Sequence, residues 1–219
     1  PRSYIDPNRA ETDFSLSEIS DFSKDILNID FQPTIKTKLG IGLIWLKVPP
    51  DGEDMYAKKL TYDQVAYRIL NYHRPYHKKL KLILKNTYDK YKCFFHINCH
   101  SMQNNASAMS TQEKGTLRPD FVIGDRDGTS CNKKFTNLVV TILKDLNYDV
   151  VINDPYKGME LVSAYSNPAN NKHSLQIEVN RRLYMDEKTR IKTDGFNVLK
   201  EHLSLMIREM KQFAEKELR

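Results

Sequence analysis

Hydrophobic and polar positions along the chain follow the helical repeat in three long runs. From Thr61 the apolar residues recur at helical spacing, and Thr61 with Gln64 has the form of a capping box. Pro75 lies inside this run and should kink the helix or split it near Tyr72–Arg74, because proline lacks an N–H and clashes with the preceding turn. The same spacing predicts two later helices, Lys133–Leu146 and Asp194–Glu217.

Shorter runs predict β-strands. The clearest of these strands extends from Ser174 to Asn180, where polar and apolar residues alternate strictly. Strands that alternate with helices indicate an α/β fold built in layers. Residues 1–50, in contrast, are irregular, and a turn is expected at Pro49–Gly52. The other predicted strands are Cys93–Asn98, Phe121–Gly124 and Tyr148–Asn153.

Polar residues stand where these strands end. Asn98 and His100 come at the end of the strand that begins at Cys93. Asp125 and Asn153 come at the ends of the next two predicted strands. In open α/β sheets the residues at such positions tend to gather at the functional site. A histidine just past a strand is held rigidly and can offer a neutral ring nitrogen to a metal, although a structural or merely polar role is the alternative for His100.

Two further segments offer polar chemistry, each with a structural alternative. Glu178 lies on the polar face of its strand, where a carboxylate acts either as a catalytic base or as the ion-pair partner of an arginine. Asn8 and Arg9 combine an amide with a planar guanidinium fork, which suits a carboxylate or a developing oxyanion. The alternative for this segment is a turn in which Arg9 pairs with Asp6.

Two other patterns carry less information. His73 and His77 have the i, i+4 spacing of a zinc-binding helix, but the residue after His73 is arginine instead of the usual glutamate, and Pro75 disturbs the turn. We expect this pair to have capping or supporting roles. Asp127–Ser130 precedes a helix whose N-terminus would attract anions, unless Ser130 simply caps it.

Composition limits the class of protein. A chain of 219 residues makes one domain or a little more, and no run approaches the roughly 18 apolar residues of a membrane span. The formal net charge is +6, but the lysines lie mostly on helix faces without a nucleic-acid-binding motif, so we expect a solvated basic surface. The cysteines form no Cys-x-x-Cys pattern, which indicates a reducing cytoplasm and buried thiols at Cys93, Cys99 and Cys131.

Taken together and in this order, these segments resemble the N-formylglutamate amidohydrolase family. That family is similar in fold to zinc carboxypeptidases, so the resemblance implies a single α/β domain over residues 1–219, with a mixed central sheet flanked by helices (phosphorylase/hydrolase-like). The similarity covers most of the chain. The matching stretches are Pro1–Arg9, His73–His77, Asn98–Met102, Arg118–Cys131, Asn153–Gly158 and His173–Met185.

The resemblance also implies a zinc enzyme and roles for particular residues. His100 matches a zinc ligand, and Glu178 matches the catalytic glutamate. Asn8 and Arg9 match the pair that engages the substrate carboxylate or the oxyanion, so Arg9 has both a catalytic and a binding role. The substrate site is expected to include Ser101, Arg118 and Arg181 as well.

The reaction implied is hydrolysis of the amide bond of an N-formyl or other N-acyl acidic amino acid, above all N-formyl-L-glutamate. Zinc would acidify a water molecule, Glu178 would take its proton, and zinc with an arginine would stabilise the oxyanion. The expected partner is a small anionic acyl-amino acid, in cytoplasmic amino-acid catabolism. Neither nucleic acid nor a membrane is expected to take part, and the oligomeric state is left open.

Departures from the family pattern leave other hypotheses open. Two further zinc ligands are expected from a His-Ser-Gly region, and since Pro1 is neither an initiator Met nor part of a signal peptide, we expect that region upstream of it. Asn98 stands where the family usually has Asp, which should weaken the orientation of His100. The alternatives are a catalytically incomplete member that binds ligand without turnover, and a basic nucleic-acid-binding protein.

Overall fold

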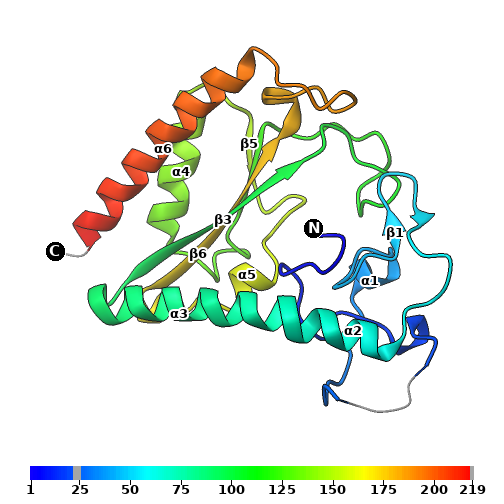
Figure 1. Ribbon diagram of the computed structural model, residues 1–219. Coiled ribbons are helices and arrows are strands. Elements are labelled where there is room, and N and C mark those ends of the chain that lie inside the picture. Colours follow the sequence, from blue (N-terminus) through cyan, green and yellow to red (C-terminus); the bar gives the residue numbers. More distant parts are fainter. Residues whose placement is uncertain (22–25, 218–219) are drawn as a thin grey trace. The chain divides into compact units, whose positions relative to one another are not determined.

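The computed structural model of this chain describes residues 1–21 and 26–217 (Figure 1). Two compact units make up the chain. The first unit comprises Pro1–Ile83 and Ser107–Ser110, and the second comprises Leu84–Ala106 and Thr111–Arg219. The organisation as a single domain stays a prediction.

The second unit is built around a four-stranded sheet with the order β3-β6-β4-β5. Strand β3 runs parallel to β6, whereas β4 runs antiparallel to β6 and parallel to β5. The mixed sheet that the resemblance implied is therefore confirmed. The strands are β3 (Phe94–Met102), β4 (Phe121–Gly124), β5 (Val150–Ile152) and β6 (Lys172–Asn180).

Two long helices and the sheet enclose the apolar core of the second unit. Leu175 and Ile177 of β6 belong to a buried cluster with Phe135 and Leu143 of α4 (Lys133–Asp145) and with residues of α6 (Gly195–Glu217). Figure 1 shows α4 and α6 running beside each other next to the sheet. Both helices were predicted from their spacing, and both are confirmed within a residue or two of the expected bounds.

The opposite face of β6 is polar, and it is buried as well. Side chains alternate along a strand, so the residues between the apolar ones point away from α4 and α6. Such groups need hydrogen-bond partners to offset the loss of water. This face therefore carries a buried polar row, made by Ser174, Gln176, Glu178 and Asn180, which are 0%, 2%, 7% and 0% exposed.

The start of α4 differs from the simplest prediction. Asn132 is the N-cap, and its side chain accepts a hydrogen bond from the Lys134 N–H. Ser130 is therefore not the N-cap of α4. Its hydroxyl instead donates to the Ser174 carbonyl oxygen at 2.9 Å, which ties the loop before α4 to strand β6. The alternative that Ser130 caps this helix is therefore wrong.

The first unit has little regular structure over residues 1–50, as the sequence predicts. Its buried apolar residues include Phe14, Leu43, Val65 and Ile69, which form a separate core cluster. The expected turn at 49–52 joins two short antiparallel strands. The short elements are η1 (Leu16–Glu18), α1 (Ile35–Lys38), β1 (Lys47–Val48) and β2 (Glu53–Asp54).

One helical run contains a π-helical turn. Helix α2 (Tyr62–Arg68) begins with the predicted capping box at Thr61, η2 (Ile69–His73) is π-helical, and α3 (Arg74–Tyr91) follows. The interruption expected near Tyr72–Arg74 is confirmed. The ring of Pro75 would clash with the carbonyl four residues earlier, and the wider π turn relieves that clash.

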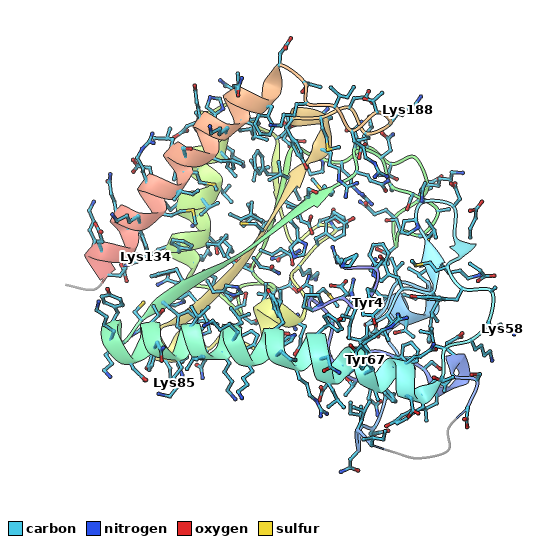
Figure 2. The ribbon with its side chains drawn as sticks, viewed as in Figure 1. Tyr4, Lys58, Tyr67, Lys85, Lys134 and Lys188 are labelled. Atoms are coloured by element: carbon cyan, nitrogen blue, oxygen red, sulfur yellow. The ribbon has the colours of Figure 1, made fainter. Side chains whose placement is uncertain are left out.

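Several lysines of the second unit lie at its surface. Lys85, Lys134 and Lys188 are exposed, and Figure 2 shows their side chains pointing outward. No helix within residues 1–21 and 26–217 is both long enough and apolar enough to cross a membrane. The short elements of this unit are α5 (Glu160–Ser163), η3 (Pro168–Asn170) and η4 (Arg181–Leu183).

Candidate functional site

His100 and Glu178 lie side by side on neighbouring strands. The register of β3 and β6 pairs His100 with Glu178. Paired residues of adjacent strands point to the same face, and their backbones lie about 4.8 Å apart. The two side chains therefore project together from the polar face, and the expected proximity of His100 and Glu178 is confirmed. Their catalytic and metal-binding roles stay predictions.

The position of His100 differs from the sequence-based expectation. His100 lies inside β3 and not beyond its end, because pairing with β6 extends the strand to Met102. The backbone of His100 is thus held by a neighbouring strand on one side, which is a stiffer support than a loop. A side chain placed in this way suits a function that requires a fixed direction.

Two amide side chains on the polar face, those of Asn98 and Gln176, form a chain of hydrogen bonds that ends at Glu178. Asn98 Nδ2 donates to Gln176 Oε1 at 3.4 Å, and Gln176 Nε2 donates to Glu178 Oε1 at 3.1 Å. A carboxylate can only accept hydrogen bonds, so Gln176 must turn its nitrogen toward Glu178 and its oxygen toward Asn98. Asn98 must then be a donor. Gln176 was missed from the sequence, although its place two residues before Glu178 on the same strand was a signal.

Changing Asn98 to Asp is expected to weaken the support of Glu178. An aspartate at this position cannot donate to Gln176, and its negative charge would disfavour the ionised form of Glu178. The acidic limb of the pH profile of kcat/KM should therefore move to higher pH, by about half a unit or more. Asn98→Ser, which keeps a hydroxyl donor without the charge, is the control. An unmoved acidic limb in Asn98→Asp would rule out this role.

Ser101 and Arg181 are in contact with each other, on the other side of β3 from His100. Ser101 directly follows His100, so its side chain points to the opposite face. There its hydroxyl accepts a hydrogen bond from Arg181 Nε at 3.2 Å, and Arg181 Nη1 lies 3.7 Å from a carboxylate oxygen of Glu187. The structure thus brings these two predicted substrate-binding residues together, but not on the face that carries Glu178.

Arg118 is buried next to the end of β6. Its guanidinium donates to Gln103 O at 3.2 Å and to Gln112 Oε1 at 3.0 Å, and it lies 5.4 Å from the centre of the Tyr156 ring. The Arg118 carbonyl accepts a hydrogen bond from Asn180 Nδ2 at 3.2 Å. Since Asn180 is two residues beyond Glu178 on the polar face, Arg118 is anchored close to the proposed site.

Asp125 and Asn153 lie together just after the carboxyl ends of β4 and β5. Asn153 Nδ2 donates to Asp125 Oδ1 at 2.7 Å, and Asn153 Oδ1 accepts from the Asp125 N–H at 3.0 Å. Gly124 pairs with Gln176, the partner of Asn98, and the expectation that Asp125 and Asn153 gather with Asn98 and His100 stays a prediction. Because β4 is antiparallel to β6, the carboxyl ends of β4 and β5 point away from those of β3 and β6.

Arg9 of the first unit is buried with unsatisfied donors. Arg9 and Asn8 are each 5% exposed, and among the described residues Arg9 Nε and Nη1 have no hydrogen-bond partner. Burial lowers the pKa of the Arg9 guanidinium, and the Asp6 carboxylate opposes this shift. Buried donors without partners are costly, so Arg9 is a candidate anion-binding group.

The structural alternative for this segment, a clamp between Arg9 and Asp6, is only loosely formed. Arg9 Nε lies 3.8 Å from Asp6 Oδ2. That carboxylate is engaged elsewhere, since it accepts hydrogen bonds from Arg2 Nε at 2.7 Å and from the Asn8 N–H at 3.0 Å. Arg9 is therefore left with donor capacity that a ligand carboxylate or oxyanion would use.

His73 and His77 support the same segment. His73 Nε2 lies 2.9 Å from the Arg9 carbonyl oxygen, and His77 Nε2 lies 2.9 Å from the Pro7 carbonyl oxygen. The two rings have centroids 4.2 Å apart. Each ring thus directs a nitrogen at the backbone, and the supporting role expected for the pair stays a prediction.

The donors beside Glu178 fit zinc in kind but do not make up a full ligand set. Imidazole nitrogen and carboxylate oxygen are both zinc ligands, and a catalytic zinc has three protein ligands as a rule. Within residues 1–21 and 26–217, no three His, Cys, Asp or Glu side chains lie close enough to hold a metal ion. His100 is accordingly one candidate ligand, with further ligands required.

The cysteines are free thiols with different environments. Cys93 and Cys131 are buried, as expected, and burial raises the pKa of the Cys131 thiol to about 12. Cys99 is exposed, so the expectation that it is buried is wrong. It lies on β3, which is an edge strand of the sheet and is covered by a neighbouring strand on one side only.

Stability is expected to fall on mild acidification. Burial lowers the pKa of His73, His96 and His173, so between the lowered values and about pH 6.5 the unfolded chain binds more protons than the folded one. The free energy of unfolding should hold its full value above pH 6.5 and decline below it, by up to about 1.4 kcal/mol per pH unit for each histidine. Urea unfolding between pH 7.5 and 5.5 measures this. A flat or rising profile would contradict it.

Comparisons with known proteins agree on one family. The family model described as N-formylglutamate amidohydrolase matches residues 1–185. An N-formylglutamate deformylase of Pseudomonas putida is 22% identical over 199 residues, covering 81% of this chain and 72% of that protein. The crystal structure of an N-formylglutamate amidohydrolase from Ralstonia eutropha JMP134 has a TM-score of 0.87 and 39% identity, covering 99% of this chain and 74% of that one.

A more distant solved structure shares the fold alone. A gene product of Agrobacterium tumefaciens has a TM-score of 0.61 at 12% identity, covering 95% of this chain and 67% of that one.

Proposed function

The chain belongs to the N-formylglutamate amidohydrolase family, and from this membership we propose that it hydrolyses the amide bond of an N-formylated acidic amino acid in a zinc-dependent reaction. N-formyl-L-glutamate is the proposed substrate, and L-glutamate and formate are the products. The observation that carries the proposal is the pairing of His100 with Glu178 on adjacent parallel strands, at a buried polar face.

Glu178 acts as the general base and then as the general acid. Its carboxylate takes a proton from the attacking water and passes it to the departing amine. Gln176 Nε2 donates to Glu178 Oε1 at 3.1 Å, which holds the carboxylate in one orientation. Burial beside His100 keeps bulk water away, so the proton is exchanged with the substrate.

His100 provides one zinc ligand next to the base. When bound, zinc would lower the pKa of a water molecule and polarise the acyl carbonyl. The register of β3 and β6 pairs His100 with Glu178, so a water bound by the zinc would lie near both side chains. The strand backbone fixes the direction of both groups, so little reorganisation is needed during the reaction.

Asn8 and Arg9 bind the negative charge of the substrate or of the transition state. An acidic amino acid with a blocked amine carries two carboxylates, and its amide develops an oxyanion on attack. Arg9 Nε and Nη1, without partners among the described residues, offer the fork that such groups accept. The proposed site therefore favours anionic acyl-amino acids.

Release of formate by the full-length, zinc-loaded protein tests this proposal. We expect turnover of N-formyl-L-glutamate and a kcat/KM about 10- to 100-fold lower for N-formyl-L-leucine, because a charge-assisted hydrogen bond contributes about 1.5–3 kcal/mol. A chelator should abolish turnover, and added zinc should restore it. Zinc-loaded protein that binds N-formyl-L-glutamate but releases no formate would instead identify a family member without turnover.

A further inference from the structure

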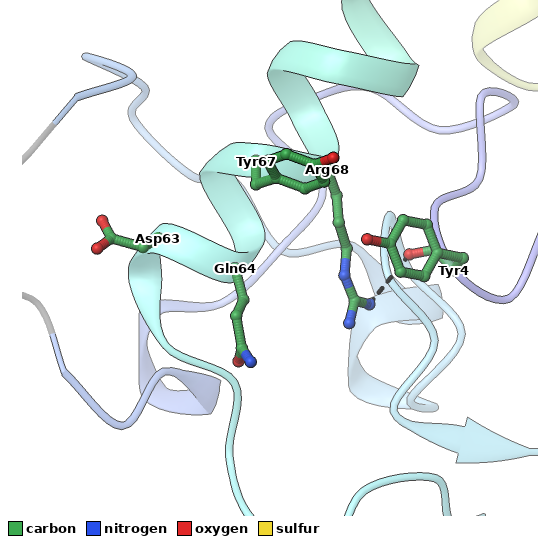
Figure 3. A pocket seen from close by; sticks show the side chains of 5 residues that line it. All are labelled: Tyr4, Asp63, Gln64, Tyr67 and Arg68. Atoms are coloured by element: carbon green, nitrogen blue, oxygen red, sulfur yellow. Dashed lines mark hydrogen bonds between the residues drawn. The ribbon is translucent and has the colours of Figure 1, made fainter.

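Three side chains of one helical run hold the backbone of residues 4–9, the Arg9 loop. Arg68 Nη1 donates to the Tyr4 carbonyl oxygen at 3.1 Å, as Figure 3 shows. His77 and His73 direct their Nε2 atoms at the carbonyl oxygens of Pro7 and Arg9, each at 2.9 Å. The three contacts are spread along the whole loop.

The Arg9 loop depends on such contacts for its shape. Residues 4–9, all of them described, form no helix or strand. Turn hydrogen bonds stabilise it from within, for example from the Arg9 N–H to the Asp6 carbonyl oxygen at 3.1 Å. The two histidines act on either side of Asn8, at the carbonyls of Pro7 and Arg9, and so fix the backbone that carries the proposed anion-binding pair.

The π turn brings the three side chains to one face. Arg68 and His73 are five residues apart, and in an α-helix that separation rotates a side chain about 140° away from the first. In a π turn, whose hydrogen bonds join residues five apart, the two lie on one face, much as residues four apart do in an α-helix. His73 and His77 are four apart at the start of α3, which is the α-helical spacing for one face.

Imidazole suits this task because it donates without bringing a charge. A neutral ring with its proton on Nε2 serves a carbonyl acceptor and adds no repulsion to the buried Arg9 guanidinium. His73 Nδ1 is buried and has no hydrogen-bond partner among the described residues, so a second proton on that ring would be unpaired. A lysine at position 73 would place a second buried cation next to Arg9.

We propose that Arg68, His73 and His77 are positioning residues, which hold Asn8 and Arg9 in the orientation that binds the substrate anion, and that the π turn serves to align them. This inference rests on the proposed anion-binding role of Arg9. None of the three touches the reacting atoms. They act through the loop backbone, and through the direction that this backbone gives to the Arg9 side chain.

Paired substitutions of the two histidines test the inference. His73→Leu and His77→Leu remove the donor, whereas His73→Gln and His77→Gln keep an amide donor that can reach the same carbonyl. We expect the leucine variants to raise KM and Kd for N-formyl-L-glutamate about 10-fold or more, with a smaller change in kcat, because small displacements of a binding group are costly. The glutamine variants should recover most of the affinity.

Two controls separate positioning from a general loss of structure. Leu70→Ala changes an exposed residue of the same π turn and should leave KM unchanged. Each variant is also compared by its melting temperature, because a merely structural role would lower stability without shifting KM of the folded fraction. Folded leucine variants with wild-type KM and Kd would overturn the inference.

The affinity measurement also distinguishes this inference from the proposed function. Kd for N-formyl-L-glutamate, measured by calorimetry, does not depend on turnover. If the wild-type protein binds this compound but releases no formate, the proposed function fails, and the inference is still judged by Kd in the leucine and glutamine variants. If the wild type releases formate and all four variants match it in KM and Kd, the inference alone fails.

Discussion

Glu178→Gln is expected to lower kcat for formate release about 100-fold or more, while the protein keeps its fold and its zinc. The amide has almost the same shape as the carboxylate, and its oxygen can still accept the hydrogen bond that Gln176 Nε2 donates at 3.1 Å. An amide cannot take a proton from water near neutral pH. The measurement is kcat together with zinc content and circular dichroism of the same preparation.

Glu201→Gln is the matched control for this change. Glu201 is exposed on α6, so the same loss of one carboxylate should leave kcat unchanged. Should Glu178→Gln keep more than about a tenth of the wild-type kcat, Glu178 is not the general base. The ion-pair interpretation of this residue would then be the better one.

Arg9→Met is expected to have the second largest effect, on binding. Loss of the guanidinium should raise KM for N-formyl-L-glutamate about 10- to 100-fold, since charge-assisted hydrogen bonds contribute about 1.5–3 kcal/mol. The melting temperature should be unchanged or higher, because the variant no longer buries donors that lack partners among the described residues. Steady-state kinetics and thermal unfolding measure the two effects.

Two other arginine variants make this result specific. Arg9→Lys keeps the charge without the planar fork and should fall between wild type and Arg9→Met. Arg208→Met removes an exposed arginine of α6, and it should leave KM nearly unchanged. A destabilised Arg9→Met with wild-type KM would favour the structural clamp between Arg9 and Asp6.

Local patterns predicted the elements of the second unit well. The strict alternation from Ser174 to Asn180 identified β6 and its two faces, because a strand with one apolar face must bury it. The apolar spacing of α4 and α6 was equally clear. These elements pack against one another in a single core, so local preference and tertiary packing agree.

The direction of each strand relative to its neighbours could not be predicted from the sequence of a single segment. Asp125 and Asn153 follow strands, as predicted, but whether a strand runs with or against its neighbour depends on the connections and on pairing with distant residues. The same limit explains His100. Its segment becomes part of β3 through pairing with β6, about 78 positions away, and not through its own apolar pattern.

The candidate site was predicted in part from residues and in part from resemblance. Residue type and position placed His100, Glu178 and the Asn8–Arg9 pair among the candidates, whereas the choice between their functional and structural roles came from the family. Gln176 was overlooked because an amide has no distinctive motif. Its function follows from donor and acceptor geometry, which becomes visible once the strand register is known.

Zinc content measured beside formate release, in wild type and in His100→Ala, tests most directly whether His100 and Glu178 share one centre. We expect about one zinc per full-length chain and turnover in the wild type, with both lost in His100→Ala and only turnover lost in Glu178→Gln. Full zinc content and wild-type turnover in His100→Ala would contradict a metal centre at this pair of strands.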